Sequence, residues 1–245
     1  MKAPASSSVR PPMAARVDRR AAILLAAEKL FAQYGYRAVT IRQIAQEAQV
    51  PLALVGYYFG PKQDLFHAIF EHWSPTIDQR LARLRAVPID PADPRTLPRI
   101  IEAFIGPVLE LRASAEGEYY ALLVARELYN ATGEADRVLR DYFDPLAHAY
   151  IDALHAALPH ATRGQVAKGY QLAMGVLLTH MSDARIERLS HGEQRPADPA
   201  AAPMLVSFVV GGLRAALPRP RPAAGRTAFA RTKNPPGRTE TRRPA

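Results

Sequence analysis

Thr40, Tyr57 and Lys62 carry the polar groups from which the chemistry of this sequence is best inferred. A hydroxyl, a phenol and a flexible ammonium are side-chain types that contact nucleic-acid phosphates. All three lie in one segment, residues 38–62, which reads AVTIRQIAQEAQVPLALVGYYFGPK. The segment therefore indicates a nucleic-acid interface, provided that the surrounding elements point these groups the same way.

Two short helices joined by a turn are expected to position these groups. Thr40 can cap a helix that runs to about Ala48, and Gln43 completes a capping box. Residues 49–51 form the turn, and Pro51 fits the first position of the next helix, which ends at Phe59. The apolar residues expected to face inward and hold the pair together are Ile41, Ile44, Ala45, Val50, Val55 and Phe59.

The remaining residues of the second short helix are expected to form its outer surface. They are Pro51, Leu52, Ala53, Gly56, Tyr57 and Tyr58. A helix held in this way presents its N-terminal half to the major groove of DNA. Leu52 and Ala53 could contact a thymine methyl group, whereas Arg42 and Gln43 could reach base edges. DNA shape offers a further source of specificity.

Apolar residues at three- and four-residue spacings continue through most of the chain and predict an all-α fold of about nine helices. No segment alternates as a strand would. The expected helices span about residues 17–34, 41–48, 51–59, 61–84, 97–113, 118–131, 134–158, 163–189 and 200–217. A disordered arm is expected over residues 1–16 and a disordered basic tail over residues 218–245.

Charge is distributed unevenly along the 245 residues, whose net charge is +9. Residues 1–62 hold nine Lys/Arg against three Asp/Glu, and residues 218–245 hold eight against one. The stretch between them, residues 63–217, holds fifteen against nineteen. A basic head on an acidic body is typical of a phosphate-binding module joined to a regulatory domain. The charge of the tail fits equally well a solvated chain end.

Several classes of function find no support in the sequence. The absence of cysteine excludes disulfides and thiolate metal sites. The seven histidines form no metal-binding pattern, and no P-loop, G-x-S-x-G or G-x-G-x-x-G motif occurs. No enzyme activity, metal or cofactor is therefore expected. The apolar run Met204–Leu213 is too short for a membrane span and residues 1–16 do not read as a signal peptide, so a cytoplasmic protein is expected.

The sequence resembles the TetR family of transcriptional regulators over about residues 17–77. The first helix carries RRAAILLAAEKLFAQYGY, residues 40–50 follow T-x-x-x-I-A-x-x-A-x-V, and residues 57–66 follow Y-Y-F-G-x-K-x-x-L-F. Two departures stand out. The family usually has Gly where Gln49 stands, which predicts a strained backbone there. Ser is common where Pro51 and Pro61 stand, so backbone amides must replace the lost hydroxyls.

The resemblance implies an N-terminal helix-turn-helix DNA-binding domain (17–77) and a C-terminal ligand-binding and dimerisation domain (78–217). It implies a homodimer through the helices near 163–189 and 200–217, a palindromic double-stranded operator, and a cytoplasmic, nucleoid-associated repressor released by a small-molecule effector. The DNA-binding residues expected are Thr40, Arg42, Gln43, Pro51, Leu52, Ala53, Tyr57, Tyr58 and Lys62.

The middle helices of such a protein enclose a ligand pocket, for which an apolar or acyl-type effector is expected. The candidate lining residues are Trp73, Phe104, Tyr119, Tyr120, Arg126, Tyr129, His148, Tyr170, Met174 and His180. Arg126 could anchor an anionic ligand group or pair with a nearby acidic residue.

Two other classes of protein stay open at this point. One is an architectural nucleic-acid-binding protein without an effector, in which the basic ends dominate. The other is a helical enzyme or binding protein that merely carries a short helix pair.

Overall fold

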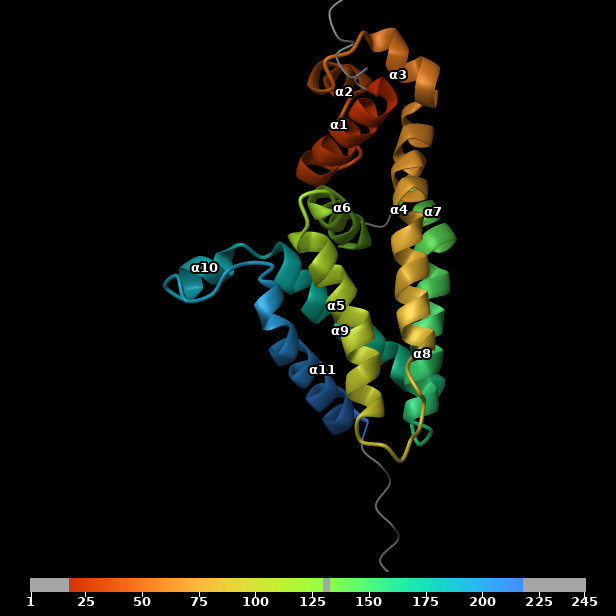
Figure 1. Ribbon diagram of the computed structural model, residues 1–245, viewed down its shortest axis with the longest axis vertical. Helices are drawn as coiled ribbons and strands as arrows, with labels where there is room; N and C mark the ends of the chain where they lie inside the picture. The colour runs from red at the N-terminus through yellow and green to blue at the C-terminus, as the bar shows by residue number, and fades with distance from the viewer. Residues whose placement is uncertain (1–17, 130–132, 218–245) are drawn as a thin grey trace, which may run out of the picture.

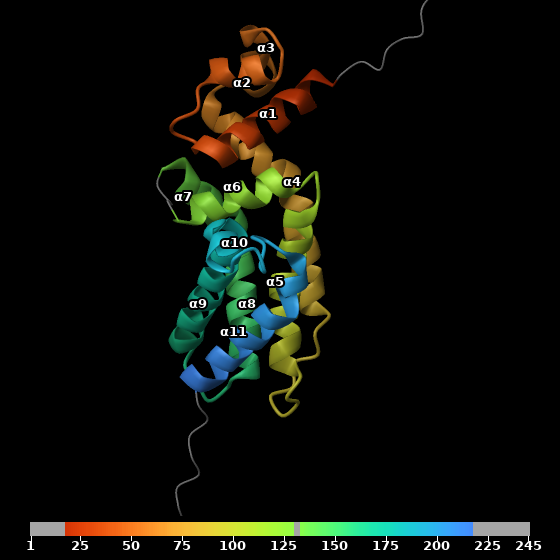
Figure 2. The ribbon, with the colours of Figure 1, turned by 90° about the vertical axis from the view of Figure 1, so that its left-hand side faces the viewer.

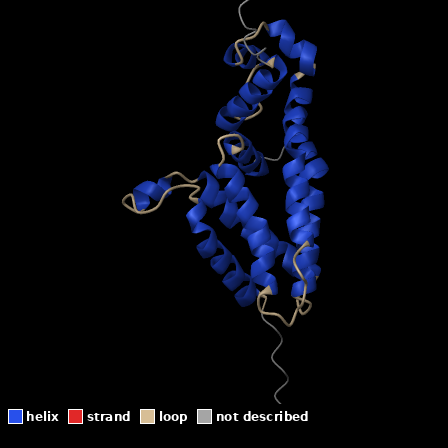
Figure 3. Cartoon of the chain, in the orientation of Figure 1, coloured by secondary structure: helices blue, strands red, loops and turns tan. Residues whose placement is uncertain are grey.

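The computed structural model describes residues 18–129 and 133–217, and these residues form helices without any strand (Figure 3). The α-helices are α1 (Arg19–Tyr34), α2 (Ile41–Glu47), α3 (Leu52–Phe59), α4 (Lys62–Arg85), α5 (Thr96–Ala113), α6 (Glu118–Tyr129), α7 (Glu134–Val138), α8 (Asp144–Ala157), α9 (Arg163–Ser182), α10 (Arg185–Leu189) and α11 (Ala202–Ala216). A π-helical turn, Leu139–Phe143, joins α7 to α8, and a 3-10 turn, Pro199–Ala201, precedes α11.

The helices form a head and a body that share one long helix (Figure 1). α1, α2 and α3 make the head, and α4 runs from the head along the length of the body. α5, α8, α9 and α11 complete the body, while α6 lies between the two parts and packs against both α1 and α5. A movement of α4 or α6 would therefore change contacts in both the head and the body.

Two hydrophobic cores underlie this division. The core of the head includes Phe31, Phe66 and Phe70, and α6 contributes Tyr120 and Leu123 to it. The core of the body begins on α4 at Ile77 and continues through α5, α8, α9 and α11. The division between the cores thus falls inside α4, between Phe70 and Ile77, so a continuous helical backbone joins them.

Two of the long helices that the sequence predicts are interrupted in the structure. The predicted helix 134–158 is α7, the π-helical turn and α8, and the interruption lies just before Pro145, which has no N–H to continue the ladder. The predicted helix 163–189 ends at Ser182, because Asp183 leaves the helical conformation (φ −87°, ψ 90°). The described residues therefore contain more helices than the approximately nine expected, and the all-helical fold is confirmed. The predicted arm (1–16) and tail (218–245) lie outside the described residues.

α11 leaves much of its apolar surface uncovered. The window Pro199–Ala216 has the length and composition of a membrane-crossing segment, yet only 28% of it is buried. α11 itself has 15 residues. At 1.5 Å per residue it spans about 22 Å, less than the roughly 30 Å of a bilayer core. Leu205, Val209 and Leu213 on one side of α11 are buried in the body. The uncovered apolar surface is therefore on the opposite side, which carries Met204 and Phe208.

Candidate DNA-binding surface and ligand cavity

The start of α2 is held by the capping box that the sequence predicts. The Gln43 amide donates to the Thr40 hydroxyl oxygen at 3.3 Å, and the Thr40 amide donates to the Gln43 side-chain oxygen at 2.8 Å. Both side chains are exposed, as is Arg42 between them. The cap fixes where α2 begins and leaves the side-chain amide nitrogen of Gln43 available to a ligand.

The turn between α2 and α3 depends on a left-handed residue. Gln49 has φ 55°, the left-handed region that glycine adopts most easily and the conformation on which the predicted strain depends. The Val50 amide then donates to the carbonyl of Ala45 at 3.0 Å and closes the turn. The conformation of Gln49 and this hydrogen bond therefore set the angle between α2 and α3.

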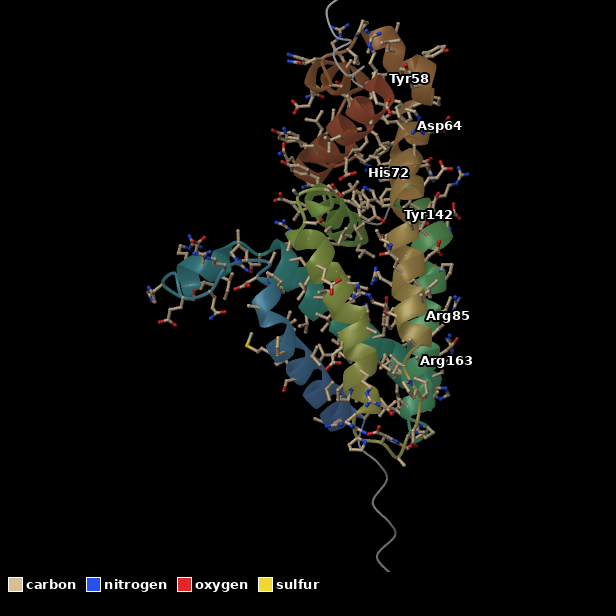
Figure 4. The ribbon with its side chains drawn as sticks, in the orientation of Figure 1. Tyr58, Asp64, His72, Arg85, Tyr142 and Arg163 are labelled. Atoms are coloured by element: carbon tan, nitrogen blue, oxygen red, sulfur yellow. The ribbon has the colours of Figure 1, made fainter. Side chains whose placement is uncertain are left out.

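α3 is anchored on one side and exposed on the other. Val55 is fully buried and Phe59 is 8% exposed, whereas Tyr57 is 80% exposed. The residues that the sequence places on the outer surface, Pro51, Leu52, Ala53, Gly56, Tyr57 and Tyr58, are all exposed. Tyr58 lies at the far end of the head in Figure 4. An exposed helix held by buried anchors is the geometry that entering a DNA groove requires.

The N-termini of α3 and α4 have no side-chain cap. Pro51 and Pro61 occupy the two N-cap positions, one residue earlier than the sequence predicts, and neither side chain accepts a hydrogen bond. The first amides of both helices therefore keep their donors and the positive end of the helix dipole. Both features suit a phosphate oxygen.

Two cations of the head lie on aromatic rings. The Lys62 ammonium is 4.3 Å from the centroid of the Tyr36 ring, and partial burial lowers its pKa. The Arg20 guanidinium lies 5.0 Å from the centroid of the Phe59 ring at the end of α3. Arg20 is not among the DNA contacts expected from the sequence, because its proximity to α3 depends on how α1 packs.

The body contains a cavity of about 450 Å³ between α4, α5, α6, α8 and α9. Its walls are Val108, Val124, Leu128, Leu139, Phe143, Leu146, Ala147, Tyr170, Met174, Gly175, Leu177, Leu178 and Met181, with the charged or amide residues Arg80, Asp144 and Gln171. A largely apolar cavity of this size with a few polar groups suits a small organic molecule.

Comparisons with known proteins identify both parts of the chain. Residues 23–69 match the family described as "Bacterial regulatory proteins, tetR family". Residues 102–212 match "Tetracyclin repressor-like, C-terminal domain". The chain belongs to the TetR family of transcriptional regulators. Members of this family are DNA-binding regulators and not enzymes.

Individual TetR-family relatives agree with this assignment. The transcriptional repressor BepR of Brucella suis is 29% identical over 204 residues, which cover 81% of this chain and 93% of BepR. The repressor NicS of Pseudomonas putida is 39% identical, and the regulator HbdR of an Aromatoleum species 41%, but the matched residues span only 42% and 29% of their lengths.

Solved structures show the same fold. A TetR-like regulator from Rhodococcus sp. RHA1 has a TM-score of 0.53 at 23% identity, covering 83% of this chain and 98% of that one. The fatty acid degradation regulator FadR from Bacillus halodurans has a TM-score of 0.56 at 16% identity, covering 81% and 98%.

Two of the pocket residues expected of a TetR-family protein line the cavity, namely Tyr170 and Met174. Phe104 is buried behind them, with its ring centroid 5.5 Å from that of Tyr170. Arg80 lines the cavity as well, although it is not among the residues expected from the sequence. Arg80 lies three residues after the buried Ile77, on the apolar stripe of α4, and a cation on such a stripe is the signal that could have found it.

The other expected pocket residues lie elsewhere. Arg126 is exposed and donates to the carbonyl of Gln33 at the end of α1 (3.2 Å). His148 lies on the outside of α8 beside Arg163, and His180 interacts with the carbonyl of Asp198 (3.1 Å). Tyr119 packs at the edge of the head core, and the side chain of Tyr129 lies outside what the structure describes.

Trp73 and Tyr120 join the head to the body instead of lining the cavity. Their rings stack with centroids 5.1 Å apart and an interplanar angle of 12°. The indole nitrogen of Trp73 donates to Glu28 at 2.7 Å, and Glu28 is only 2% exposed. Burial raises the pKa of Glu28 to about 7. These residues of α1, α4 and α6 form one contact, here called the Glu28 junction.

Proposed function

We propose that this TetR-family protein is a repressor that binds a palindromic operator as a homodimer and releases it when a small molecule occupies the body cavity. The observation that carries the proposal is the exposed face of α3, held by the buried side chains of Val55 and Phe59. The domain limits proposed are 17–77 for DNA binding and 78–217 for ligand binding and dimerisation.

The proposed DNA contacts divide by chemistry. Tyr57, Thr40 and Lys62, together with the uncapped amides of α3 and α4, would bind phosphates. The proposed contacts with bases and groove walls come from Arg42, Gln43, Pro51, Leu52, Ala53 and Tyr58. To contact a phosphate, the Lys62 ammonium would have to leave the face of the Tyr36 ring, and this contact would be lost. Its contribution to affinity is therefore expected to be smaller than that of a fully solvated lysine.

Dimerisation is proposed through α9 and α11. The two helices contact each other on one face of the body (Figure 2), and α10 projects from that face (Figure 1). Leu172 on α9 and Met204 and Phe208 on α11 are 60%, 63% and 67% exposed. Gly211 has nothing within 4 Å of where a Cβ would stand, so a partner helix could approach closely there. A second copy on this face would cover these side chains.

Release by a ligand is proposed because α4 belongs to both the head and the cavity. Lys62 at the start of α4 and Arg80 at the cavity are separated by 18 residues, about 27 Å of helix at 1.5 Å per residue. A ligand that binds better when α4 is displaced would shift the population of heads away from the spacing that DNA requires. A regulator of this family acts in the cytoplasm, and association with the nucleoid is proposed from its DNA binding.

Selection of bound sequences from a random duplex pool tests the proposal. The protein lacking residues 218–245 is used at near-physiological salt, so that the basic tail does not add non-specific affinity. A two-fold symmetric motif is the expected result. If no motif is recovered and affinity is lost as the salt concentration rises, the architectural nucleic-acid-binding protein would be favoured instead.

A pair of tyrosine variants locates the interface on the head. Tyr57→Ala should weaken binding to the selected site by about tenfold, since it removes one exposed contact of α3. Tyr34→Ala is the matched control, because Tyr34 is also exposed (58%). Tyr34 is the last residue of α1, whereas α3 is contacted by Arg20 at the start of α1. If the two substitutions change the affinity for the selected site equally, Tyr57 does not contact DNA.

A further inference from the structure

Arg80 is a cation facing an apolar cavity without an acidic partner. Its Nε is buried and has no hydrogen-bond partner among the described residues. None of the ion pairs formed by those residues includes Arg80. By contrast, Arg83, one turn further along α4, is bound to Glu110 at 2.8 Å. Arg80 as a whole is half-buried, and a cation that is partly removed from water is costly unless an anion compensates it.

The charge of Arg80 acts on the hydroxyls of Tyr120, Tyr150 and Tyr170, and among the described residues that line the same cavity the one carboxylate is Asp144. Burial raises the pKa of Tyr170 to about 12, and the charge of Arg80 opposes that rise, so the guanidinium acts on the tyrosine of the cavity wall. Burial also raises the pKa of Tyr150, which Arg80 opposes through its charge and a hydrogen bond. The Tyr150 hydroxyl itself donates to the Ala103 carbonyl at 2.7 Å. None of these tyrosines supplies the negative charge that Arg80 lacks.

The rest of the wall limits what could supply it. Arg80 is the only Lys or Arg among the described residues that line the cavity, and the carboxylate among them, Asp144, is exposed. The other contacts are chiefly aliphatic or aromatic, including Val108, Phe143 and Met174. A ligand that fits both features carries one anionic group and an apolar body. A second anionic group would meet Asp144 or hydrocarbon.

We propose that the effector is a small amphipathic monocarboxylate whose carboxylate pairs with Arg80 and whose apolar body fills the cavity. The planar guanidinium matches a carboxylate with two parallel hydrogen bonds. The inference rests on the proposed ligand response and specifies its chemistry. Because Arg80 belongs to α4, the pairing acts directly on the helix that continues into the DNA-binding head.

Calorimetric titration with matched acid and alcohol probes tests the inference. Octanoate is compared with octanol, and hydrocinnamate with hydrocinnamyl alcohol, on the full-length protein near neutral pH. At least one acid should bind about tenfold or more tightly than its alcohol, a difference of about 1.4 kcal/mol. This comparison needs no variant, so it stands even if a substitution at Arg80 prevents folding.

Two substitutions on the same helix assign the preference to one side chain. Arg80→Met keeps the length and apolar volume of the side chain and should abolish the preference for the acid, whereas Arg80→Lys should keep part of it. Arg83→Met is the control and should leave the preference unchanged, since Arg83 lies outside the cavity lining.

The inference is overturned if no acid binds, if acids and alcohols bind equally, or if Arg80→Met keeps the preference. Its failure is distinguishable from failure of the proposed function. Recovery of an operator without any binding of the acids would leave the regulator in place and remove the carboxylate effector. Preferential binding of the acids without recovery of an operator would support the carboxylate ligand and contradict the proposed DNA-binding function.

Discussion

Replacing Glu28 by Gln should make the protein more stable at alkaline pH. In the Glu28 junction, one carboxylate oxygen accepts from the Trp73 indole at 2.7 Å, while the other is buried without a hydrogen-bond partner among the described residues. Burial therefore raises the pKa of Glu28 from 4.5 to about 7. A glutamine would keep the acceptor for Trp73 and could not ionise.

The sign and size follow from proton linkage. Between about pH 4.5 and 7 the folded protein holds a proton on Glu28 that the unfolded chain releases, so the free energy of unfolding falls as pH rises. The stabilising contribution is complete below the unfolded pKa and is lost as pH passes through the folded pKa. At about 1.4 kcal/mol per pKa unit, the loss amounts to about 3 kcal/mol.

Urea unfolding followed by tryptophan fluorescence measures this directly, because Trp73 is the only tryptophan of the chain and lies in the junction itself. Wild type and Glu28→Gln should have similar unfolding free energies near pH 5. Near pH 8.5 the variant should be more stable by about 3 kcal/mol. Protein concentration is kept constant, since dimerisation would add to apparent stability.

Glu71→Gln provides the control for loss of a negative charge, since Glu71 lies on the exposed side of α4. It should leave the pH dependence of stability unchanged. Parallel pH profiles for wild type and Glu28→Gln would refute the reasoning, because they would show that Glu28 binds no extra proton in the folded state.

Four other substitutions test packing, backbone strain and assembly. Phe208→Glu, on the exposed side of α11, should convert a dimer into a monomer in sedimentation velocity; an unchanged dimer would exclude this face. Gly117→Ala should lower the unfolding free energy by about 1–3 kcal/mol, because the new Cβ would stand 2.8 Å from the carbonyl oxygen of Leu111. Gly164→Ala on α9, whose new Cβ would meet only the Thr162 hydroxyl at 4.0 Å, should be neutral or stabilising by up to about 1 kcal/mol. Gln49→Gly should relieve the left-handed strain and leave stability equal or higher by up to about 1 kcal/mol, as thermal unfolding would show; a loss above 1 kcal/mol would contradict the strain.

The sequence by itself determined the all-helical fold, the α2–α3 pair and the exposed face of α3. Each of these depends on residues within one or two helical turns of one another. The capping box of Thr40 with Gln43 spans four residues, and the left-handed turn at Gln49 follows from its place between two short helices. Backbone geometry alone relates such neighbours, so residue type and spacing suffice to predict them.

The cavity and the junction between head and body were decided by tertiary structure. Trp73 and Tyr120 have the composition of pocket residues, yet they pack on Glu28, which lies 45 positions before Trp73 in the chain. Arg80 lines the cavity only because α5, α8 and α9 close around α4. Helical periodicity shows which side of a helix is buried, but it does not show which other helix covers that side. Whether a buried polar side chain meets a partner, a neighbouring domain or an open cavity therefore depends on contacts between distant segments.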